Sequence, residues 1–243
     1  MRIALLGYGK MGKAIEEIAL EKGHQVVLTI DEHNLAEFTK ENLQKADVAI
    51  EFTGPHAAFE NIKKALGFGV PVVSGSTGWI ERKDEIESFC NAHNGAFLYS
   101  SNFSIGVNIF FEINKKLASM MAGHPEYKAS MEEIHHTAKK DAPSGTAISL
   151  AEQILEQTPS KKKWVNQESN DAAELPIISR RIDPAPGTHI IRYSSPIDDI
   201  EIVHTAHSRK GFASGAVLAA EFLSRSVSGG KKGVYAMKDV LDL

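Results

Sequence analysis

The stretch RIALLGYGKMGKAIEEIALEKGHQVVLTID, residues 2–31, decides which fold the sequence predicts. A short apolar run leads into a turn that contains Gly7, Gly9 and Gly12. The residues after this turn have helical spacing up to Gly23, and a second apolar run ends at Asp31. Strand, glycine turn, helix, strand and acid in this order are typical of dinucleotide-binding units, where glycines let backbone N–H groups approach a pyrophosphate at a helix N-terminus.

The glycine turn and the acid form the candidate cofactor site. Asp31 lies nineteen residues after Gly12, where an acid that binds a ribose diol is expected. Glu32 follows it, and two neighbouring carboxylates would repel a 2′-phosphate, which favours NADH. Lys10 argues the other way, because its ammonium group could reach that phosphate, so NADPH stays possible. The predicted contacts of the turn are Gly7, Tyr8, Gly9, Lys10, Met11 and Gly12.

The same pattern continues through the first half of the chain. Apolar runs at 47–53, 70–78 and 96–106 each end in a small polar turn, and a helix-like segment follows the first of them. This alternation predicts an α/β fold with a Rossmann-like, doubly wound parallel sheet, whose ligands lie beyond the carboxyl ends of the strands. Residues in these turns could therefore share one crevice, or be ordinary turn residues: Thr53, Gly75, Ser76, Thr77, Asn102 and Phe103.

The second half predicts a different architecture. One helix near 107–121 is followed by strand-like runs that are separated mainly by loops, which indicates an antiparallel or mixed sheet. A long helix at 211–228 then returns the chain to the cofactor domain. We therefore expect a discontinuous dinucleotide-binding domain, 1–104 plus 210–243, around an inserted α+β domain, 105–209. The polar segment from Pro159 to Pro176 is interpreted as a loop.

The segment EIHHTAKKDAPSGTA, residues 133–147, carries the candidate chemistry. His135 and His136 fall near the end of a predicted strand, and Lys139 follows in a short loop. Ser144 is a plausible helix N-cap, which would leave the N–H groups of Gly145 and Thr146 at a positive helix end. Imidazole and ammonium groups beside such an end can bind a carboxylate and transfer protons near neutral pH.

Three other interpretations of this segment stay open. A zinc site would use His135, His136 and either His204 or His207, although adjacent histidines on a strand point to opposite faces and no H-E-x-x-H spacing exists. A serine hydrolase would need Ser144 in a G-x-S-x-G elbow, which the sequence lacks. In a purely structural interpretation, the histidines pack at a sheet edge.

Composition limits the other possible classes of function. The net charge of -4 gives no sign of a nucleic-acid-binding surface, and the single Cys90 excludes an internal disulfide and a cysteine-rich metal site. The N-terminal residues lack the features of a signal peptide, and no apolar run reaches membrane-spanning length. We therefore expect a cytoplasmic protein without membrane or nucleic-acid partners and without a metal.

The segment EIHHTAKKDAPSGTA also closely resembles the signature of the dihydrodipicolinate reductase family. The resemblance extends over nearly the whole chain, through the glycine turn, FTGP, GSTG, SNFSIGVNI and, near the C-terminus, HSRKGFASGA. It implies NAD(P)H-dependent reduction of 4-hydroxy-tetrahydrodipicolinate to tetrahydrodipicolinate, with loss of water, in lysine and diaminopimelate biosynthesis. It also implies a homotetramer assembled through the inserted domain, which binds the substrate.

The resemblance assigns roles to individual residues. It implies that His135 is the catalytic acid or base, that Lys139 donates a proton, and that His136, Gly145 and Thr146 bind the carboxylates of a small dicarboxylate substrate. It further implies contacts with the nicotinamide ribose and ring from Gly75, Ser76, Thr77, Ser100, Ser101, Asn102 and Phe103. The chain departs from the family pattern in three places. Its glycine turn is one residue shorter than in many members, and Ser100-Ser101 replaces a more alanine-like pair. Glu32 stands where NADPH-using members often carry arginine.

Two other functions remain as alternatives. The chain could be a related amino-acid dehydrogenase that acts on aspartate or diaminopimelate, which substrate assays would separate. It could also be an NADH-sensing protein without activity, although a sensor does not need the proton donors. Arg209, in HSRKGF, has three interpretations. It could contact the substrate, it could stabilise closure of the two domains, or it could be an ordinary surface charge.

Overall fold

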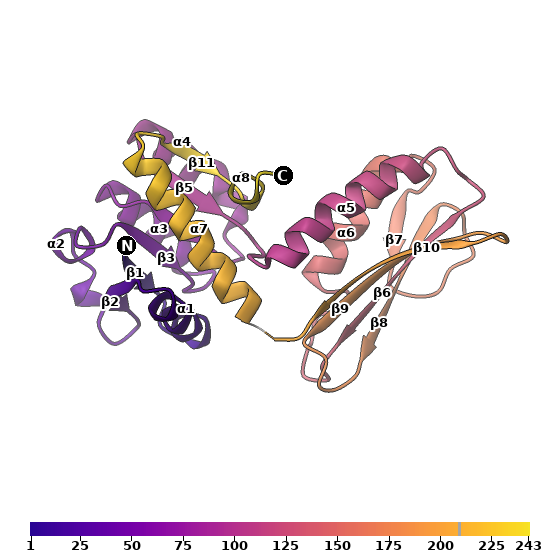
Figure 1. The fold of residues 1–243 in the computed structure, drawn as a ribbon, viewed down its shortest axis with the longest axis horizontal. Helices are drawn as coiled ribbons and strands as arrows, with labels where there is room; N and C mark the ends of the chain where they lie inside the picture. Colours follow the sequence, from indigo (N-terminus) through magenta and orange to yellow (C-terminus); the bar gives the residue numbers. More distant parts are fainter. Residues whose placement is uncertain (209) are drawn as a thin grey trace. The chain divides into compact units, whose positions relative to one another are not determined.

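The computed structural model describes residues 1–208 and 210–243 of the protein (Figure 1). The chain forms two compact units, each with its own sheet and core. The first comprises Met1–Ile105 and Lys210–Leu243, and the second comprises Gly106–Arg209. In the described part of the chain, no helix combines the length and the apolar character that a membrane span requires.

A six-stranded parallel sheet forms the centre of the first unit, in the order β11-β5-β4-β3-β1-β2. This confirms the predicted doubly wound sheet. Its strands are β1 (Arg2–Leu6), β2 (Gln25–Ile30), β3 (Val48–Glu51), β4 (Val72–Ser74), β5 (Ala96–Tyr99) and β11 (Gly233–Tyr235). Its helices are α1 (Lys10–Glu21), α2 (Lys40–Leu43), α3 (Ala58–Gly67), α4 (Lys83–Ala92), α7 (Lys210–Ser228) and α8 (Met237–Leu241), with short 3₁₀ turns η1 (Leu35–Glu37) and η2 (Ile80–Arg82).

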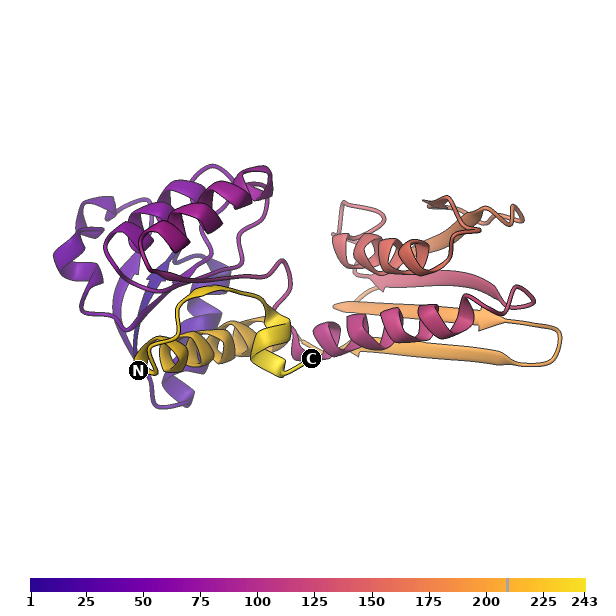
Figure 2. The same cartoon turned by 90° about the horizontal axis from the view of Figure 1, so that it is seen from above.

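Helices cover both faces of this sheet, as Figure 2 shows for α7 on one side and α3 and α4 on the other. Alternate residues of β1 explain the two layers, because successive strand side chains point to opposite faces. Ile3 and Leu5 pack with α1 and α7, whereas Ala4 and Leu6 pack with α3 and α4. Strands buried on both faces have the nearly continuous apolar character that the sequence shows.

Two glycines of the β1–α1 turn are required by close backbone packing. A Cβ atom at Gly7, where φ is +96°, would lie 2.3 Å from the carbonyl oxygen of Phe52. At Gly12 it would lie 2.2 Å from the carbonyl oxygen of Gly7. The tight turn therefore depends on both residues lacking side chains.

A five-stranded mixed sheet, in the order β10-β9-β6-β8-β7, forms the second unit. Strand β6 pairs antiparallel with β9 and parallel with β8, which confirms the predicted mixed sheet. The strands are β6 (Lys128–His135), β7 (Lys163–Val165), β8 (Glu174–Arg181), β9 (Gly187–Ser194) and β10 (Asp199–Ala206), and the helices are α5 (Ile105–Met121) and α6 (Gly145–Gln157). Residues of both helices pack with alternate residues of β6, including Ala129 and Met131, in one hydrophobic cluster.

The segment from Pro159 to Pro176 is not wholly a loop, as the sequence had suggested. Residues Lys163–Val165 form β7, which pairs parallel with β8 at the edge of the sheet. Three residues are too few to show a strand period, and this strand is stabilised by pairing with β8 and by the packing of Trp164 on the core. Such tertiary contacts are not visible in the local sequence.

Candidate active site

A pocket of about 830 Å³ lies at the carboxyl ends of the first strands of the parallel sheet. Of the predicted cofactor residues, it is lined by Gly7, Tyr8, Gly9, Asp31 and Thr53. A Cβ atom added at Gly9 would meet no described atom within 4 Å, so the backbone there is open to a ligand. Its position, beyond the carboxyl ends of the strands, is the one at which doubly wound sheets bind ligands, and its volume lies within the usual range of ligand pockets.

Asp31, an acid in the lining of this pocket, is held by hydrogen bonds within the turn that follows β2. One Asp31 carboxylate oxygen accepts a hydrogen bond from the backbone N–H of His33 at 2.8 Å, and the Asp31 N–H donates to Asn34 Oδ1 at 2.8 Å. The Asn34 amide in turn donates to the carbonyl of Thr29 at 2.8 Å. Glu32 also lines the pocket, so two neighbouring acidic residues belong to its lining.

The other predicted cofactor residues do not line this pocket. Lys10, Met11 and Gly12 belong to the first turn of α1. Phe103 is buried in the core of the first unit, where its ring centroid lies 5.8 Å from that of Phe52. The residues absent from the lining are Lys10, Met11, Gly12, Gly75, Ser76, Thr77, Ser100, Ser101, Asn102 and Phe103.

Glu51, at the end of β3, organises the neighbouring turns and was not singled out from the sequence. Its side chain is completely buried, and four donors surround its carboxylate. The Thr53 N–H and hydroxyl donate to Oε1 at 2.7 and 2.5 Å, and Ser76 Oγ donates to the same oxygen at 2.8 Å. Ser74 Oγ donates to Oε2 at 2.5 Å. The carboxylate therefore joins the Thr53 turn to the Ser76 turn.

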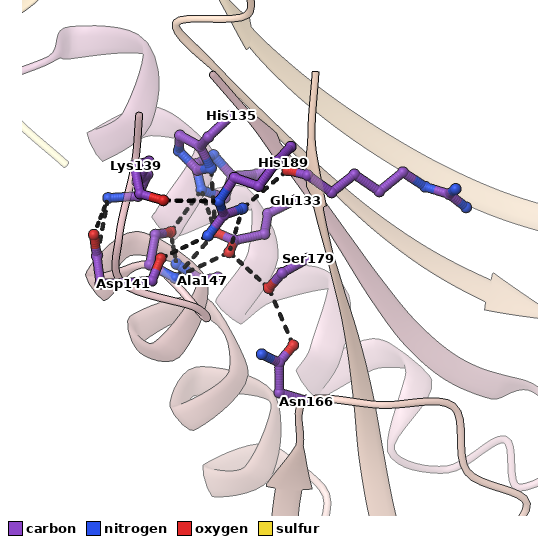
Figure 3. Close-up of polar contacts among 11 residues, drawn as sticks. Glu133, His135, Lys139, Asp141, Ala147, Asn166, Ser179 and His189 are labelled. Carbon is purple, nitrogen blue, oxygen red and sulfur yellow. Dashed lines mark hydrogen bonds and ion pairs between the residues drawn. The ribbon is translucent and has the colours of Figure 1, made fainter. Parts of the chain in front are cut away.

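In the second unit, a buried acid and two buried histidines form a cluster beside the N-terminus of α6 (Figure 3). Glu133 and His135 lie on the same face of β6, and His189 lies opposite Glu133 on β9. His135 Nδ1 is 3.4 Å from a Glu133 carboxylate oxygen, and His189 Nε2 is 3.8 Å from the same oxygen. The imidazole centroids are 5.2 Å apart, with the rings edge to face.

Strand register assembles this cluster. The pairing of β6 with β8 places Ser179 opposite Glu133 and Arg181 opposite His135. Ser179 Oγ donates to Glu133 Oε1 at 2.7 Å, and an Arg181 nitrogen lies 3.7 Å from that oxygen. The Ser144 N–H donates to both carboxylate oxygens at 3.1 Å. A shift of one residue in the register of a strand would turn its side chains to the other face of the sheet.

Lys139 lies in the loop after β6, which Arg181 braces. The Lys139 ammonium group donates to both carboxylate oxygens of Asp141, at 2.9 and 2.8 Å. The Arg181 guanidinium donates to the main-chain carbonyls of Lys139 and Asp141, at 3.2 and 2.6 Å. Arg181, which was not singled out from the sequence, therefore holds the main chain on which the candidate proton donor lies.

Ser144 is the N-cap of α6, as predicted. Its Oγ accepts a hydrogen bond from the N–H of Ala147 at 3.2 Å and lies 3.2 Å from His189 Nε2. Gly145 and Thr146 form the first turn of the helix, and a Cβ atom added at Gly145 would meet no described atom within 4 Å. His136 is half-buried just after β6. Arg209, whose role was left open, lies outside the described residues.

The charges of this cluster follow from burial and from its neighbours. Burial would raise the pKa of Glu133, but hydrogen bonds from Ser144 and Ser179 and the nearby His135 outweigh it and lower that pKa. Burial lowers the pKa of His135, opposed by the Glu133 charge and assisted by Lys139 and Arg181. Burial, with the nearby His135, lowers the pKa of His189 to about 4. His189 is therefore neutral at pH 7.

The zinc arrangement considered from the sequence does not match the cluster that forms. Within the described chain, the metal-capable side chains that come together are Glu133, His135 and His189, not His136, His204 or His207. Arg181 lies 3.7 Å from Glu133, and the charges of Arg181 and Lys139 both act on His135. Two cationic side chains beside these groups, Arg181 and Lys139, favour anion binding and proton transfer over the binding of a metal cation.

The first unit combines a doubly wound parallel sheet, a glycine turn and an acid just after β2, and the second unit contains two buried imidazoles in one cluster. This combination is typical of the class of two-domain, dinucleotide-dependent oxidoreductases. Residues 1–103 match the family model described as dihydrodipicolinate reductase, N-terminus, and residues 106–241 match the model of its C-terminus. The chain belongs to the dihydrodipicolinate reductase family, which confirms the resemblance seen in its sequence.

Curated relatives agree with this membership. The chain is 50% identical to 4-hydroxy-tetrahydrodipicolinate reductase of Christiangramia forsetii, over 99% of the chain and 98% of the relative. It is 36% identical to the protein of the same name from Methanoregula boonei, over 82% of the chain and 76% of the relative.

Solved structures agree in fold. A dipicolinate-bound dihydrodipicolinate reductase from Paenisporosarcina sp. TG-14 matches with a TM-score of 0.75 and 24% identity over 97% of both chains. The diaminopimelate (DAP) dehydrogenase of C. glutamicum, in complex with DAP, matches with a TM-score of 0.57 and 14% identity over 98% of this chain and 92% of that one.

Proposed function

We propose that the protein catalyses the NAD(P)H-dependent reduction of 4-hydroxy-tetrahydrodipicolinate to tetrahydrodipicolinate, with loss of water, in lysine and diaminopimelate biosynthesis. The 50% identity to a reductase of this name, over nearly the whole of both chains, is the observation that carries the proposal. The relative with dipicolinate bound supports a dicarboxylate as substrate.

The residues of the second unit have the chemistry that this substrate requires. Gly145 and Thr146, at the N-terminus of α6, together with His136, would bind its carboxylates. Lys139, whose side chain is 23% exposed, lies close enough to the surface to meet a ligand. On binding, a substrate carboxylate would compete with Asp141 for the ammonium group, because both are anions.

The protein contributes alignment and proton transfer to the reaction. Loss of water would leave a conjugated imine, and addition of hydride to this imine would move electron density onto the conjugated system. One proton must then be added, and His135 or Lys139 would supply it. The reduced cofactor supplies the hydride and both of its electrons.

The first experiment is a steady-state assay with freshly generated 4-hydroxy-tetrahydrodipicolinate and the reduced cofactor. Aspartate and diaminopimelate are tested separately with NAD⁺. We expect oxidation of the reduced cofactor with the first compound and no reduction of NAD⁺ with the other two. Activity with an amino acid instead would favour the alternative dehydrogenases. NADH binding without turnover of any of these compounds would favour the sensing protein.

We infer a preference for NADH over NADPH. Asp31 and Glu32 both line the pocket, and two carboxylates would repel the additional phosphate of NADPH, whereas Lys10 is not among the lining residues. In the same assay, kcat/KM should be higher with NADH. An equal or higher value with NADPH would contradict this preference.

Lys139 can be tested with a matched control in the same loop. Lys139→Ala should lower kcat about a hundredfold, since general acid catalysis typically contributes that much or more. Its dissociation constant for NADH, measured by fluorescence titration, should change by less than about threefold, because the first unit holds the cofactor. The adjacent, exposed Lys140 serves as the control, and Lys140→Ala should retain kcat. Equal losses in both variants would contradict a specific role of Lys139.

We also infer a cytoplasmic homotetramer assembled through the mixed sheet. Exposed apolar side chains on and beside β10 support the assembly, namely Ile197, Ile200 and Val203. Light scattering after size-exclusion chromatography measures its mass directly. A monomer at micromolar concentration would contradict this inference.

A further inference from the structure

We infer that Glu133 is a positioning residue for His135, which holds imidazole Nδ1 so that Nε2 is the nitrogen that exchanges protons with the substrate. This inference rests on the proposed function, in which His135 takes part in proton transfer. Glu133 begins the segment EIHHTAKKDAPSGTA and lies two residues before His135.

Groups other than His135 hold the Glu133 carboxylate in place. Its Oε1 accepts from Ser179 Oγ at 2.7 Å and faces Arg181 at 3.7 Å, and the Ser144 N–H donates to both oxygens at 3.1 Å. These partners come from β8 and from the start of α6, so three elements restrain one side chain. The carboxylate therefore cannot turn freely away from the imidazole.

The remaining side of the carboxylate faces His135 Nδ1. The Nδ1 atom lies 3.4 Å from Oε2 and has no hydrogen-bond partner among the atoms described, although the residue is only 7% exposed. A distance of 3.4 Å is long for a hydrogen bond, but such contacts commonly shorten when a substrate binds. Because a buried donor requires an acceptor, the proton of the neutral imidazole belongs on Nδ1, next to Oε2.

On the other side of the ring, a glycine leaves room for this orientation. A Cβ atom at Gly187, the first residue of β9, would lie 3.1 Å from His135 Nε2 and 3.3 Å from Cδ2. Any side chain there would press on the ring, so glycine gives the imidazole room to keep Nδ1 toward Glu133. The absence of a side chain at Gly187 therefore leaves space beside Nε2 of the ring.

His189 does not compete for the charge of Glu133. Its Nε2 is 3.8 Å from the carboxylate but 3.2 Å from Ser144 Oγ, and its pKa of about 4 keeps it neutral at pH 7. The groups that face or act on His135 are therefore the anions Glu133 and Asp141, the cations Lys139 and Arg181, and the neutral ring of His189. The nearest charge of opposite sign is Glu133.

Glu133 then stabilises the imidazolium form, much as a carboxylate does in a carboxylate–histidine pair. Without its charge, the pKa of His135 should fall further, because burial and the two cations would act with less opposition. An opposite charge within about 4–6 Å typically shifts a pKa by about 1–3 units. If protonated His135 is the active form, activity is lost as pH rises through this pKa, and that loss should move to lower pH.

The test compares Glu133→Gln with Glu132→Gln, the same substitution one residue earlier on the opposite face of β6. The Glu132 carboxylate pairs with Arg180, at 2.6 Å. Imidazole ¹⁵N NMR over a range of pH gives the protonation state of each ring nitrogen, with His135→Gln used to assign the signals. The same samples give kcat and KM as functions of pH.

In the wild type and in Glu132→Gln we expect the neutral His135 to carry its proton on Nδ1. In Glu133→Gln, the His135 pKa should fall by about one unit or more. Its kcat should fall at least about tenfold while KM changes little, since the variant keeps the carboxylate-binding groups. Unchanged His135 signals in a folded Glu133→Gln variant, or equal changes in Glu132→Gln, would overturn the inference.

A second variant decides the question if Glu133→Gln does not fold. Gly187→Ala keeps the carboxylate but pushes the ring from its Nε2 side, so it should alter the His135 signals and lower kcat. A Gly187→Ala variant with wild-type signals and kcat would overturn the inference. The NMR measurement needs no turnover. A wild-type protein that is inactive on the substrate but shows the Glu133-dependent signals would therefore refute the proposed function and not the positioning role.

Discussion

Two completely buried carboxylates, Glu51 and Glu133, organise the two candidate sites at the scale of single residues. A buried charge is costly unless hydrogen bonds replace the water it has lost. Each residue meets this requirement with donors from loops or strands that are separate in the sequence. The same bonds that make the charge tolerable also hold those segments together.

Glu51→Ala should therefore lower the free energy of unfolding by at least about 2 kcal/mol, because several buried donors lose their acceptor. Urea denaturation followed by circular dichroism measures this loss. Glu81→Ala, at an exposed position of the same unit, is the control and should stay within about 0.5 kcal/mol of the wild type. Similar values for the two variants would show that the hydrogen bonds of Glu51 do not stabilise the unit.

At the scale of an element, α6 depends on its N-cap residue, Ser144. Ser144 caps the helix through the N–H of Ala147, contacts His189 with the same oxygen, and donates its own N–H to Glu133. The beginning of the helix and the position of the buried acid are thus fixed by one residue. Because α6 packs on the mixed sheet, a loosened first turn would also loosen the cluster.

Ser144→Ala should lower the free energy of unfolding by about 0.5–2 kcal/mol, the usual cost of losing a serine cap. Ser149→Ala, within the same helix, is the matched control and should be neutral or slightly stabilising, because alanine is the better helix former. Denaturation midpoints of the two variants provide the comparison. The capping role would be contradicted if Ser144→Ala were as stable as Ser149→Ala.

At the scale of the whole molecule, the two units have separate hydrophobic cores. The first unit has one cluster on each face of its parallel sheet, and the second has one cluster between its helices and the mixed sheet. Each unit also contains one tryptophan, Trp79 in the first and Trp164 in the second. These residues allow the stability of each core to be followed separately.

Leu150→Ala should destabilise the second unit, and Ile62→Ala the first, by about 2–5 kcal/mol each, the usual cost of such cavities. The measurement is urea unfolding by fluorescence in Trp79→Phe and Trp164→Phe backgrounds, which leave one reporter each. We expect Leu150→Ala to lower the midpoint reported by Trp164 more than that reported by Trp79, and Ile62→Ala to do the reverse. Equal shifts of both reporters in both variants would indicate a single cooperative unit.

Much of the fold could be predicted from local sequence. The apolar strands and glycine turn of residues 2–31 specify a dinucleotide-binding unit, since Gly7 and Gly12 are needed at close backbone contacts. Alternating burial along β6 and the Ser144 cap were also visible, because they follow the period of a strand and the chemistry of a helix end. The strand β7 was not predicted, since three residues paired at a sheet edge leave no local pattern.

The sequence by itself determined the order of strands and helices and the presence of His135, His136 and Lys139 in one short segment, because these depend on neighbouring residues. Only the tertiary structure decided which partners they have. Strand register places His189 and Ser179 on either side of Glu133, and Arg181 beside His135. Register is set by the burial of whole strand faces, so it is a property of the assembled sheet that no single segment of the chain contains.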